Sequence, residues 1–312
     1  MASRRISNSG FKDWKPSQLP NLKGKRYVIT GGNSGIGFEA AKLLGEAGAD
    51  ITIACRTLSK GERAKKALEK TISGQVDIVQ VDLSRLASVR QAAEEVRARH
   101  AAIDGLINNA GIMQTPKQTT EDGFDLQMAS NHLGHFLWTG LLLDLVEKAK
   151  GRVAVVASLV HKFGPLQLDD LMSEKKYDPT RAYGQSKLAN LMFAFELDRR
   201  LKASGHDAIC VACHPGYSST NLQSTGPSGF FNLLYKVMNP LFAQPARNGA
   251  IPTVLAAAGV EAKRGAYYGP QSMSEARGRV SDAAVADHAL DQDASRQLWE
   301  MSEQLVGHSF LS

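Results

Sequence analysis

The sequence predicts an α/β fold in which one doubly wound, mainly parallel sheet of about seven strands carries helices on both faces. Short apolar segments alternate with longer helical segments along most of the 312 residues, and this alternation is typical of parallel strands joined by crossover helices. The apolar segments are almost continuously hydrophobic, as expected for strands that are covered on both faces. A glycine-rich turn between the first strand and the first helix also favours this fold.

Each predicted strand is a short apolar segment. In chain order the strands span 26–30, 50–54, 76–81, 105–108, 152–157, 208–213 and 266–268. The predicted helices fill the intervals, several with apolar residues at helical spacing, and they span 35–47, 60–70, 87–99, 123–148, 181–203, 247–258 and 294–305. No internal repeat or low-complexity linker interrupts the alternation. We therefore expect residues 24–312 to form a single domain behind a solvated, polar leader at 1–23.

The composition restricts the classes of function. A net charge of +6 and an isoelectric point near 9.2 would suit a nucleic-acid partner, but much of the basic excess lies in the leader and no basic stripe with interleaved aromatic residues follows it. No apolar run reaches the roughly 18 residues that indicate a transmembrane helix, and the leader lacks the apolar core of a signal peptide. We expect a cytoplasmic protein without a transmembrane segment or a nucleic-acid partner.

Cysteine and histidine patterns do not predict a metal site. The three cysteines are an odd number, which argues against a disulfide framework and fits a reducing compartment. Cys210 and Cys213 are three apart on a predicted strand, so they point to opposite faces. His132 and His135 are neighbours on a predicted helix without an evident third ligand. We interpret both histidines as packing residues or as residues that support a site.

The turn after the first strand has the composition of a phosphate-binding loop. It reads Thr30-Gly31-Gly32-Asn33-Ser34-Gly35-Ile36-Gly37. Glycine is needed where φ is positive or where a Cβ would clash, and a helix that starts here presents its first amides to a pyrophosphate. The residues expected to contact a dinucleotide in this turn are Gly31, Asn33, Ser34, Gly35, Ile36 and Gly37.

The end of the second strand indicates which dinucleotide is bound. Arg56 lies 19 positions after Gly37, where an acidic residue would select NAD and an arginine accommodates the 2′-phosphate of NADP. NADP(H) is therefore favoured over NAD(H). Ser34 and Lys60 are interpreted either as further phosphate contacts or as ordinary surface residues.

The carboxyl ends of the next two strands should line the same crevice. Asp82 and Leu83 follow the third strand, where Asp82 is placed to accept a hydrogen bond from the adenine amino group or, alternatively, to cap a helix. Asn109, Ala110 and Gly111 follow the fourth strand. There the small residues let the backbone approach the ribose, or the segment only stabilises a turn.

A second group of residues predicts proton-transfer chemistry. Tyr183 and Lys187 form the only Tyr-x-x-x-Lys in the chain, and a spacing of four places both side chains on one helix face. The ammonium would lower the pKa of the phenol from near 10, so that Tyr183 becomes a usable general acid or base. Ser158, at the end of the fifth strand, would hydrogen-bond a substrate oxygen. Asn131 would anchor a water that contacts Lys187.

The combined motifs resemble the short-chain dehydrogenase/reductase family over residues 24 to 270. They occur in the family's order as Thr30-Gly31-x-x-x-Gly35-x-Gly37, Asn108-Asn109-Ala110-Gly111, Asn131, Ser158, Tyr183-x-x-x-Lys187 and Pro215-Gly216. The resemblance implies a Rossmann-type fold with the four catalytic residues Asn131, Ser158, Tyr183 and Lys187. It also implies that Pro215, Gly216 and Thr220 hold the nicotinamide amide.

Within the family the chain is most similar to the retinol-dehydrogenase-like and light-dependent protochlorophyllide-reductase-like branch, judged by segments 54–56, 158–161 and 186–190. This implies NADP(H)-dependent interconversion of a bulky apolar ketone or aldehyde and its alcohol. Two alternatives stay open: reduction of an activated C=C bond, and a non-enzymatic NADP(H)-binding sensor or scaffold. Many retinol dehydrogenases carry an apolar N-terminal anchor, which this sequence does not show, so neither a retinoid nor another membrane-dissolved substrate is expected.

The apolar stretch 217–245 interrupts the alternation of strands and helices. It is interpreted as a C-terminal lid over the substrate, with core packing and contact with a membrane surface as alternatives. The predicted helices 123–148 and 181–203 have apolar faces that either pack between the subunits of a homo-oligomer or only cover the sheet.

Overall fold

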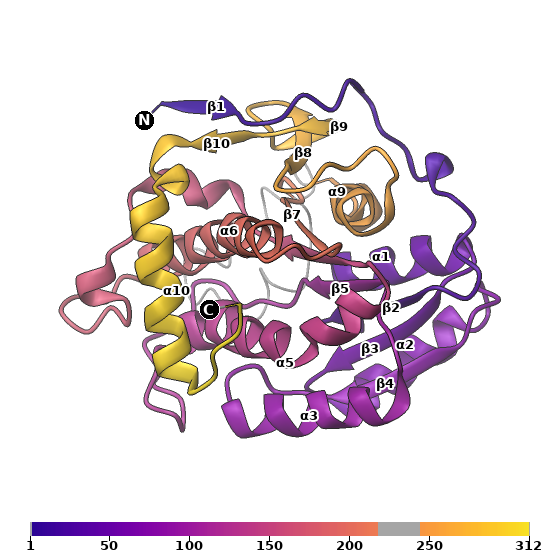
Figure 1. The fold of residues 1–312 in the computed structure, drawn as a ribbon, viewed down its shortest axis with the longest axis horizontal. Helices are drawn as coiled ribbons and strands as arrows, with labels where there is room; N and C mark the ends of the chain where they lie inside the picture. The colour runs from indigo at the N-terminus through magenta and orange to yellow at the C-terminus, as the bar shows by residue number, and fades with distance from the viewer. Residues whose placement is uncertain (1, 218–243, 312) are drawn as a thin grey trace.

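The computed structural model describes residues 2–217 and 244–311, which form layers of helices on both faces of one large sheet (Figure 1). The strand order is β4, β3, β2, β5, β6, β7, β8, β9. All strands run parallel except β9, which pairs antiparallel with β8. Their bounds are β2 (Arg26–Thr30), β3 (Asp50–Cys55), β4 (Val76–Gln80), β5 (Gly105–Asn108), β6 (Arg152–Val156), β7 (Ile209–Cys213), β8 (Tyr267–Ser272) and β9 (Arg277–Asp282).

The predicted doubly wound α/β fold is confirmed, with one strand more than expected. The strand that sequence reasoning missed is β9, whose residues Arg-Gly-Arg-Val-Ser-Asp have no apolar run. It lies at the edge of the sheet, where a strand needs to bury little surface, and on its outer side the described residues give its backbone one bridge, from Trp14 to Val280. Its neighbour β8 also extends past the predicted end at residue 268.

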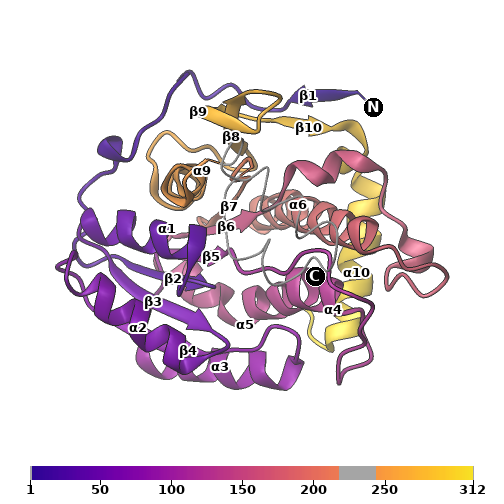
Figure 2. The same ribbon diagram turned by 180° about the vertical axis from the view of Figure 1, so that it is seen from behind.

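Two buried clusters, one on each face, hold the helices to the sheet. The helices α1 (Gly35–Glu46), α2 (Leu58–Leu68) and α9 (Ala246–Ala258) contribute to the cluster on one face. The helices α3 (Leu86–Arg99), α5 (Gly134–Lys148) and α6 (Pro179–Ala203) contribute to the other, and α10 (Gln292–Val306) packs across α5 and α6 (Figure 2). The central strands β5, β6 and β7 are buried except at Arg152 and Ile209, the first residues of β6 and β7, which explains why they read as nearly continuous apolar runs.

The predicted helix 123–148 begins later and is not uniformly α-helical. Residues 119 and 125 form a bridge across a turn, and the carboxylate of Asp125 then caps α4 (Leu126–Met128) by accepting from the amides of Gln127 and Met128. A π-helical turn over Ala129–Leu133 precedes α5. Such π-turns occur often at functional sites, and this one contains Asn131.

The predicted helix 181–203 begins two residues earlier, at Pro179. Asp178 caps it by accepting from the amide of Arg181 at 2.7 Å. Proline is favoured in the first turn because its missing N–H would have no intrahelical partner there. Pro179 therefore starts α6.

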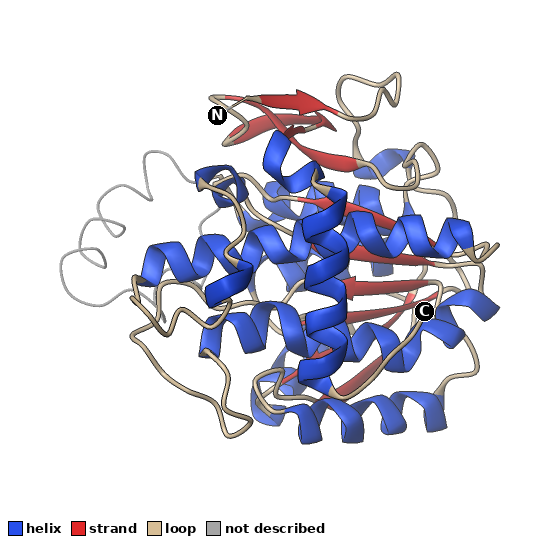
Figure 3. Cartoon of the chain, turned by 60° about the vertical axis from the view of Figure 1, so that its left-hand side comes forward, coloured by secondary structure: helices blue, strands red, loops and turns tan. Residues whose placement is uncertain are grey.

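The interpretation of residues 1–23 as a solvated leader is wrong. Strand β1 (Ser3–Arg5) pairs antiparallel with β10 (Ala284–Ala286) in a small second sheet (Figure 3). Farther on, Trp14 is 1% exposed, and its indole N–H donates to Glu261 at 2.8 Å. The leader is basic enough to look solvated, but its buried tryptophan joins the cluster that also contains α1 and α9.

Among the residues described, no helix combines the length and the apolar character that crossing a membrane would require.

Candidate active site

The carboxyl edge of the sheet gathers almost all of the residues singled out from the sequence. The chain connects β2, β3 and β4 in one direction across the sheet and β5, β6 and β7 in the other. The crevice of such a sheet lies where the direction reverses, which here is between β2 and β5. The segments that follow these strands are therefore neighbours, although they are far apart in sequence.

The glycine-rich turn leaves the N-terminus of α1 open to a ligand. Ser34 is the N-cap residue and its hydroxyl makes no capping hydrogen bond. Because the first amides of a helix have no intrahelical acceptor, those of Gly35, Ile36 and Gly37 are available to an anion. Gly31 and Gly35 have φ of +68° and +57°, which explains glycine at both positions. The turn thus fits the pyrophosphate of a dinucleotide.

Gly37 allows the turn to pack against the end of β5. A Cβ at this position would lie 2.5 Å from both the carbonyl oxygen of Gly31 and Nδ2 of Asn109. Asn109 itself donates from Nδ2 to the carbonyl of Thr30 at 2.8 Å. The segment after β5 and the glycine turn therefore form one close-packed unit.

Thr30, which the sequence places in the glycine motif without a role of its own, supports the segment after β5. Its hydroxyl accepts from the amides of Asn109 and Ala110 at 2.9 and 3.0 Å and lies 2.8 Å from Nε2 of His135. Nδ1 of His135 lies 2.9 Å from the carbonyl of Asn131. Since Nδ1 must donate to that carbonyl, Nε2 of the neutral ring accepts from Thr30. Burial lowers the pKa of His135 to about 4, which keeps the ring neutral.

Arg56 and Asp82 lie at the ends of β3 and β4, as predicted, but only one of them is uncommitted. Arg56 is exposed and forms no ion pair with a described residue, so its guanidinium is available to a phosphate. Asp82 uses Oδ1 to accept from the amide and the hydroxyl of Ser84 at 3.0 and 2.7 Å. It therefore stabilises the local turn and does not cap α3, whose N-cap residue is Arg85, while Oδ2 is left for an adenine contact. The adjacent Leu83 belongs to the hydrophobic core.

Tyr183 and Lys187 both lie on the buried face of α6, next to the end of β6. Tyr183 is 7% exposed and Lys187 is 3% exposed. Nζ of Lys187 donates to the carbonyl of Val156, the last residue of β6, at 3.0 Å. Desolvation lowers the pKa of Lys187 to about 8. The ammonium is thus held at the strand end that leads into Ser158.

Gly111 and Asn131 lie beside Lys187. A Cβ on Gly111 would lie 3.1 Å from Oδ1 of Asn131 and 3.4 Å from Nζ of Lys187, so the backbone after β5 passes directly over both groups. Asn131 accepts from the amide of Ile112 at 2.8 Å and donates to the carbonyl of Ile112 and the hydroxyl of Ser186, both at 2.9 Å. Through these hydrogen bonds the Asn131 side chain connects the segment after β5 to α6. The water that we expect it to anchor stays a prediction.

Ser158 and the Pro215-Gly216 segment follow adjacent parallel strands, β6 and β7. Ser158 caps the 3₁₀ turn Leu159–Phe163. Gly216 has φ of +67°, and a Cβ there would lie 2.3 Å from the carbonyl of Ala276. Thr220 and most of the predicted lid 217–245 lie outside the described residues.

Several other tyrosine, cysteine and histidine side chains have structural roles. Tyr177 donates its hydroxyl to the carbonyl of Thr115 at 2.8 Å. Cys210 and Cys213 are buried on opposite faces of the sheet, in different clusters. His132 lies in an aromatic cluster, with Nε2 2.9 Å from the hydroxyl of Ser302. Within the described ranges no group of three or more potential ligands is arranged to hold a metal ion.

Comparison with known proteins agrees with this geometry. The family model described as short chain dehydrogenase matches residues 25–228. Retinol dehydrogenase 14 of Homo sapiens is 36% identical over an alignment that covers 98% of this chain and 94% of that protein. For retinol dehydrogenase 13 of Homo sapiens the identity is 38%, with 92% and 86% covered.

Solved structures share the architecture. The crystal structure of an uncharacterised protein from Mycobacterium paratuberculosis is 38% identical, with a TM-score of 0.80 and coverage of 96% of this chain and 99% of that one. The Pseudomonas aeruginosa RhlG/NADP active-site complex is 23% identical, with a TM-score of 0.63 and coverage of 81% and 96%; at this identity the likeness concerns the fold alone. The glycine turn, the Tyr-x-x-x-Lys pair on α6, the family match and the retinol dehydrogenase relatives agree, and the chain belongs to the short-chain dehydrogenase family of oxidoreductases.

Proposed function

We propose that the protein is an NADP(H)-dependent oxidoreductase that interconverts a bulky apolar ketone or aldehyde and its alcohol. The observation that carries the proposal is the placement of Tyr183 and Lys187 on one face of α6, beside the strand end that leads into Ser158. A protein that only binds a dinucleotide needs none of these three residues. Their presence together therefore favours catalysis over a sensor or scaffold.

The residues have distinct roles in carbonyl reduction. When bound, the nicotinamide ring supplies the hydride that reduces the carbonyl carbon or takes it up in the reverse direction. The hydroxyl of Ser158 donates a hydrogen bond to the substrate oxygen and orients it. Tyr183 transfers its phenolic proton to that oxygen, which leaves a phenolate that solvent reprotonates. The Lys187 ammonium stabilises the phenolate through its charge.

The preference for NADP(H) rests on Arg56. Its guanidinium is exposed at the end of β3, the position that faces the adenosine ribose in this fold, and it has no acidic partner among the described residues. A 2′-phosphate would give it one. Pyrophosphate binding is assigned to the amides of the turn from Gly31 to Gly37.

The apolar substrate class is supported by the relatives. The curated relatives named above are retinol dehydrogenases, and retinol is a bulky apolar alcohol. A cytoplasmic location and a homo-oligomeric state remain predictions.

Product analysis tests the proposal. Purified protein is incubated with NADPH, or with NADH in parallel, and with apolar aldehydes, ketones and enones, and the products are identified by mass spectrometry and NMR. We expect alcohols to form with NADPH. Saturated carbonyl products from enones would support reduction of the C=C bond instead, and tight NADPH binding without any product would support the sensor reading.

A further inference from the structure

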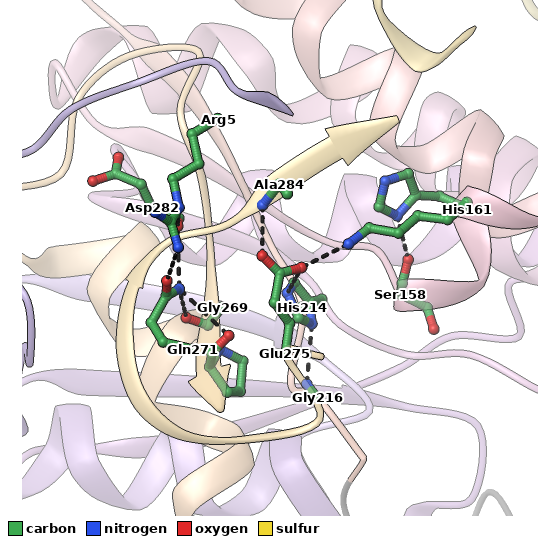
Figure 4. Close-up of polar contacts among 12 residues, drawn as sticks. Arg5, Ser158, His161, His214, Gly216, Gly269, Gln271, Glu275, Asp282 and Ala284 are labelled. Atoms are coloured by element: carbon green, nitrogen blue, oxygen red, sulfur yellow. Dashed lines mark hydrogen bonds and ion pairs between the residues drawn. The ribbon is translucent and has the colours of Figure 1, made fainter. Parts of the chain in front are cut away.

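A buried carboxylate lies behind the two strand ends that border the proposed reaction site. Glu275 is in the turn between β8 and β9 and is 8% exposed. Its Oε2 accepts from Nζ of Lys162 at 2.8 Å and its Oε1 accepts from the amide of Ala284 at 2.7 Å (Figure 4). A buried charge of this kind is retained only where it has such partners.

The backbone around Glu275 is conformationally costly. Met273, Ser274 and Glu275 have φ of +50°, +54° and +65°. Three consecutive residues with a Cβ in the left-handed region are rarely tolerated, and such a backbone persists only when the surrounding contacts determine it. Two sets of contacts hold the backbone in this conformation. They are the hydrogen bonds of the Glu275 carboxylate and the bond from the amide of Tyr217 to the carbonyl of Ala276, at 2.7 Å.

One side of Glu275 is connected to the segment that carries Ser158. Lys162 lies in the 3₁₀ turn Leu159–Phe163, whose cap is Ser158. In the same turn, Nδ1 of His161 lies 2.7 Å from the carbonyl of Ser158 (Figure 4), and Nε2 of His161 accepts from the amide of Ala286 at 3.3 Å. Strand β10 therefore supports the turn twice, through Glu275 at Ala284 and through His161 at Ala286.

The other side of Glu275 faces the segment that carries Gly216. His214 is fully buried, and its Nδ1 accepts from the amide of Gly216 at 3.2 Å. The hydrogen of the neutral ring is then on Nε2, which lies 3.8 Å from Oε2 of Glu275 (Figure 4). Burial lowers the pKa of His214 to about 3, so the ring stays neutral. At this distance the contact is an attraction between a charge and a dipole and not a direct hydrogen bond.

A ring and a glycine fix the position of His214. A Cβ on Gly269 would lie 2.0 Å from Nε2 of His214, so no larger residue could lie beneath the imidazole. Tyr267 packs between the two histidines, with ring centroids 5.5 Å from His161 and 5.2 Å from His214. The two segments therefore share one buried cluster.

We propose that Glu275 is a positioning residue that holds the Ser158 turn and the His214–Gly216 segment at a fixed separation. This inference rests on the proposed function, which gives Ser158 the substrate oxygen, and on the expectation that Gly216 contacts the nicotinamide amide. A carboxylate suits the task because it accepts from an ammonium and a backbone amide while also attracting the imidazole N–H. Glu275 reaches the reacting atoms only through these neighbours.

The test compares Glu275→Gln with Glu196→Gln. Glu196 is also a buried, paired carboxylate, 2% exposed and bonded to Arg199 and Arg200, but it lies more than two helical turns beyond Lys187 on α6. Hydrogen exchange at residues 157–163 and 214–217 is measured for both variants and for wild type, together with kcat and the Kd for NADPH. Lys162→Met is examined in the same way in case Glu275→Gln fails to fold.

Glu275→Gln is expected to speed exchange in both segments and to lower kcat by about tenfold or more, since small misplacements of reacting groups are costly, while the Kd for NADPH changes less than kcat. Glu196→Gln is expected to lower thermal stability without either effect. If wild type reduces no carbonyl compound, the proposed function fails and the exchange measurement alone decides the role of Glu275. Unchanged exchange in Glu275→Gln, faster exchange in only one segment, equal loosening by Glu196→Gln, or an unchanged kcat would each overturn the proposal.

Discussion

The charge on Lys187 depends on its burial. The ammonium has the carbonyl of Val156 as an acceptor at 3.0 Å, yet desolvation lowers its pKa to about 8. The protonated form, which is the one that stabilises a phenolate at Tyr183, is populated below that pKa and is lost above it.

Activity should therefore fall as the pH rises through about 8. We expect kcat/KM for carbonyl reduction to decline above this value, because deprotonation of Lys187 removes the positive charge beside Tyr183. The measurement is a pH profile of kcat/KM for wild type and for Lys187→Arg. A guanidinium stays charged to much higher pH, so whatever activity this variant retains should not decline near pH 8. A wild-type profile that rises through pH 9 would contradict the assignment.

Arg56 is expected to control the choice of cofactor. Replacing it with Ala should raise the KM for NADPH by about ten- to a hundredfold, the effect of losing a charge-assisted hydrogen bond, and should leave the KM for NADH nearly unchanged. The control is Arg63→Ala, which removes an exposed arginine that lies within α2 and not at the end of β3. Equal effects on the two cofactors would show that Arg56 does not bind the 2′-phosphate.

At this scale the sequence predicts residues in motifs better than residues that support them. Tyr183, Lys187 and the glycine turn have fixed spacings that chemistry requires, so a single sequence shows them. Thr30 and Glu275 act through contacts with residues about 80 and 113 positions away. Nothing in the local sequence of Glu275 distinguishes it from an ordinary turn residue, because its burial is created only by the packing of β8, β10 and the Ser158 turn.

At the level of elements, the start of α1 is the most constrained part of the site. A Cβ on Gly37 would lie 2.5 Å from the carbonyl oxygen of Gly31, so it would push the helix away from the turn. We expect Gly37→Ala to weaken NADPH binding by tenfold or more and to destabilise the fold by about 1–3 kcal/mol, as overpacking usually does. Cofactor titration and urea unfolding measure the two effects. Unchanged binding would mean that the turn is not the pyrophosphate site.

Elements were predictable where burial and periodicity agree. The seven predicted strands and six of the seven predicted helices begin and end within about four residues of their predicted positions, and the exception is the helix predicted over 123–148, where α5 begins at Gly134. The agreement follows because both faces of the sheet are covered. The edge strand β9 and the π-turn Ala129–Leu133 were not predictable. The first buries few side chains, and the second depends on contacts of Asn131 with residues on other segments.

On the scale of the whole molecule, the N-terminal segment is part of the core. Trp14 is 1% exposed and packs beside α9, with a hydrogen bond to Glu261. Trp14→Ala should lower the free energy of unfolding by about 3–5 kcal/mol, as expected when a large aromatic side chain is removed from a core. Phe163→Ala, at a residue 66% exposed, should change it by less than about 0.5 kcal/mol. Equal losses in urea denaturation would restore the solvated-leader interpretation.

Buried histidines should make the fold sensitive to acid. Desolvation lowers the pKa of His132 and His214 to about 3 and that of His135 and His161 to about 4. Their folded pKa values lie below 6.5, so between about pH 4 and 6.5 the unfolded chain binds more protons and stability falls as the pH falls.

At pH 5 these four histidines should therefore together bind about four protons from solvent when the chain unfolds, which is seen as a positive slope of unfolding free energy against pH. His132→Leu should lower the number of protons taken up on unfolding by about one, and the slope falls in proportion. The difference between the two proteins isolates the histidine from buried carboxylates such as Asp198, whose raised pKa acts in the opposite direction. An identical slope in both would contradict a neutral His132.

The central claim is that Tyr183 transfers the proton in an NADP(H)-dependent reaction, and one paired assay tests it most directly. NADPH oxidation by wild type and by Tyr183→Phe is followed with the same apolar carbonyl substrate, and the Kd for NADPH is measured for both proteins. We predict a loss of at least about a hundredfold in kcat, the usual range for a removed general acid, with the Kd for NADPH unchanged. Comparable turnover by the two proteins would show that another group supplies the proton.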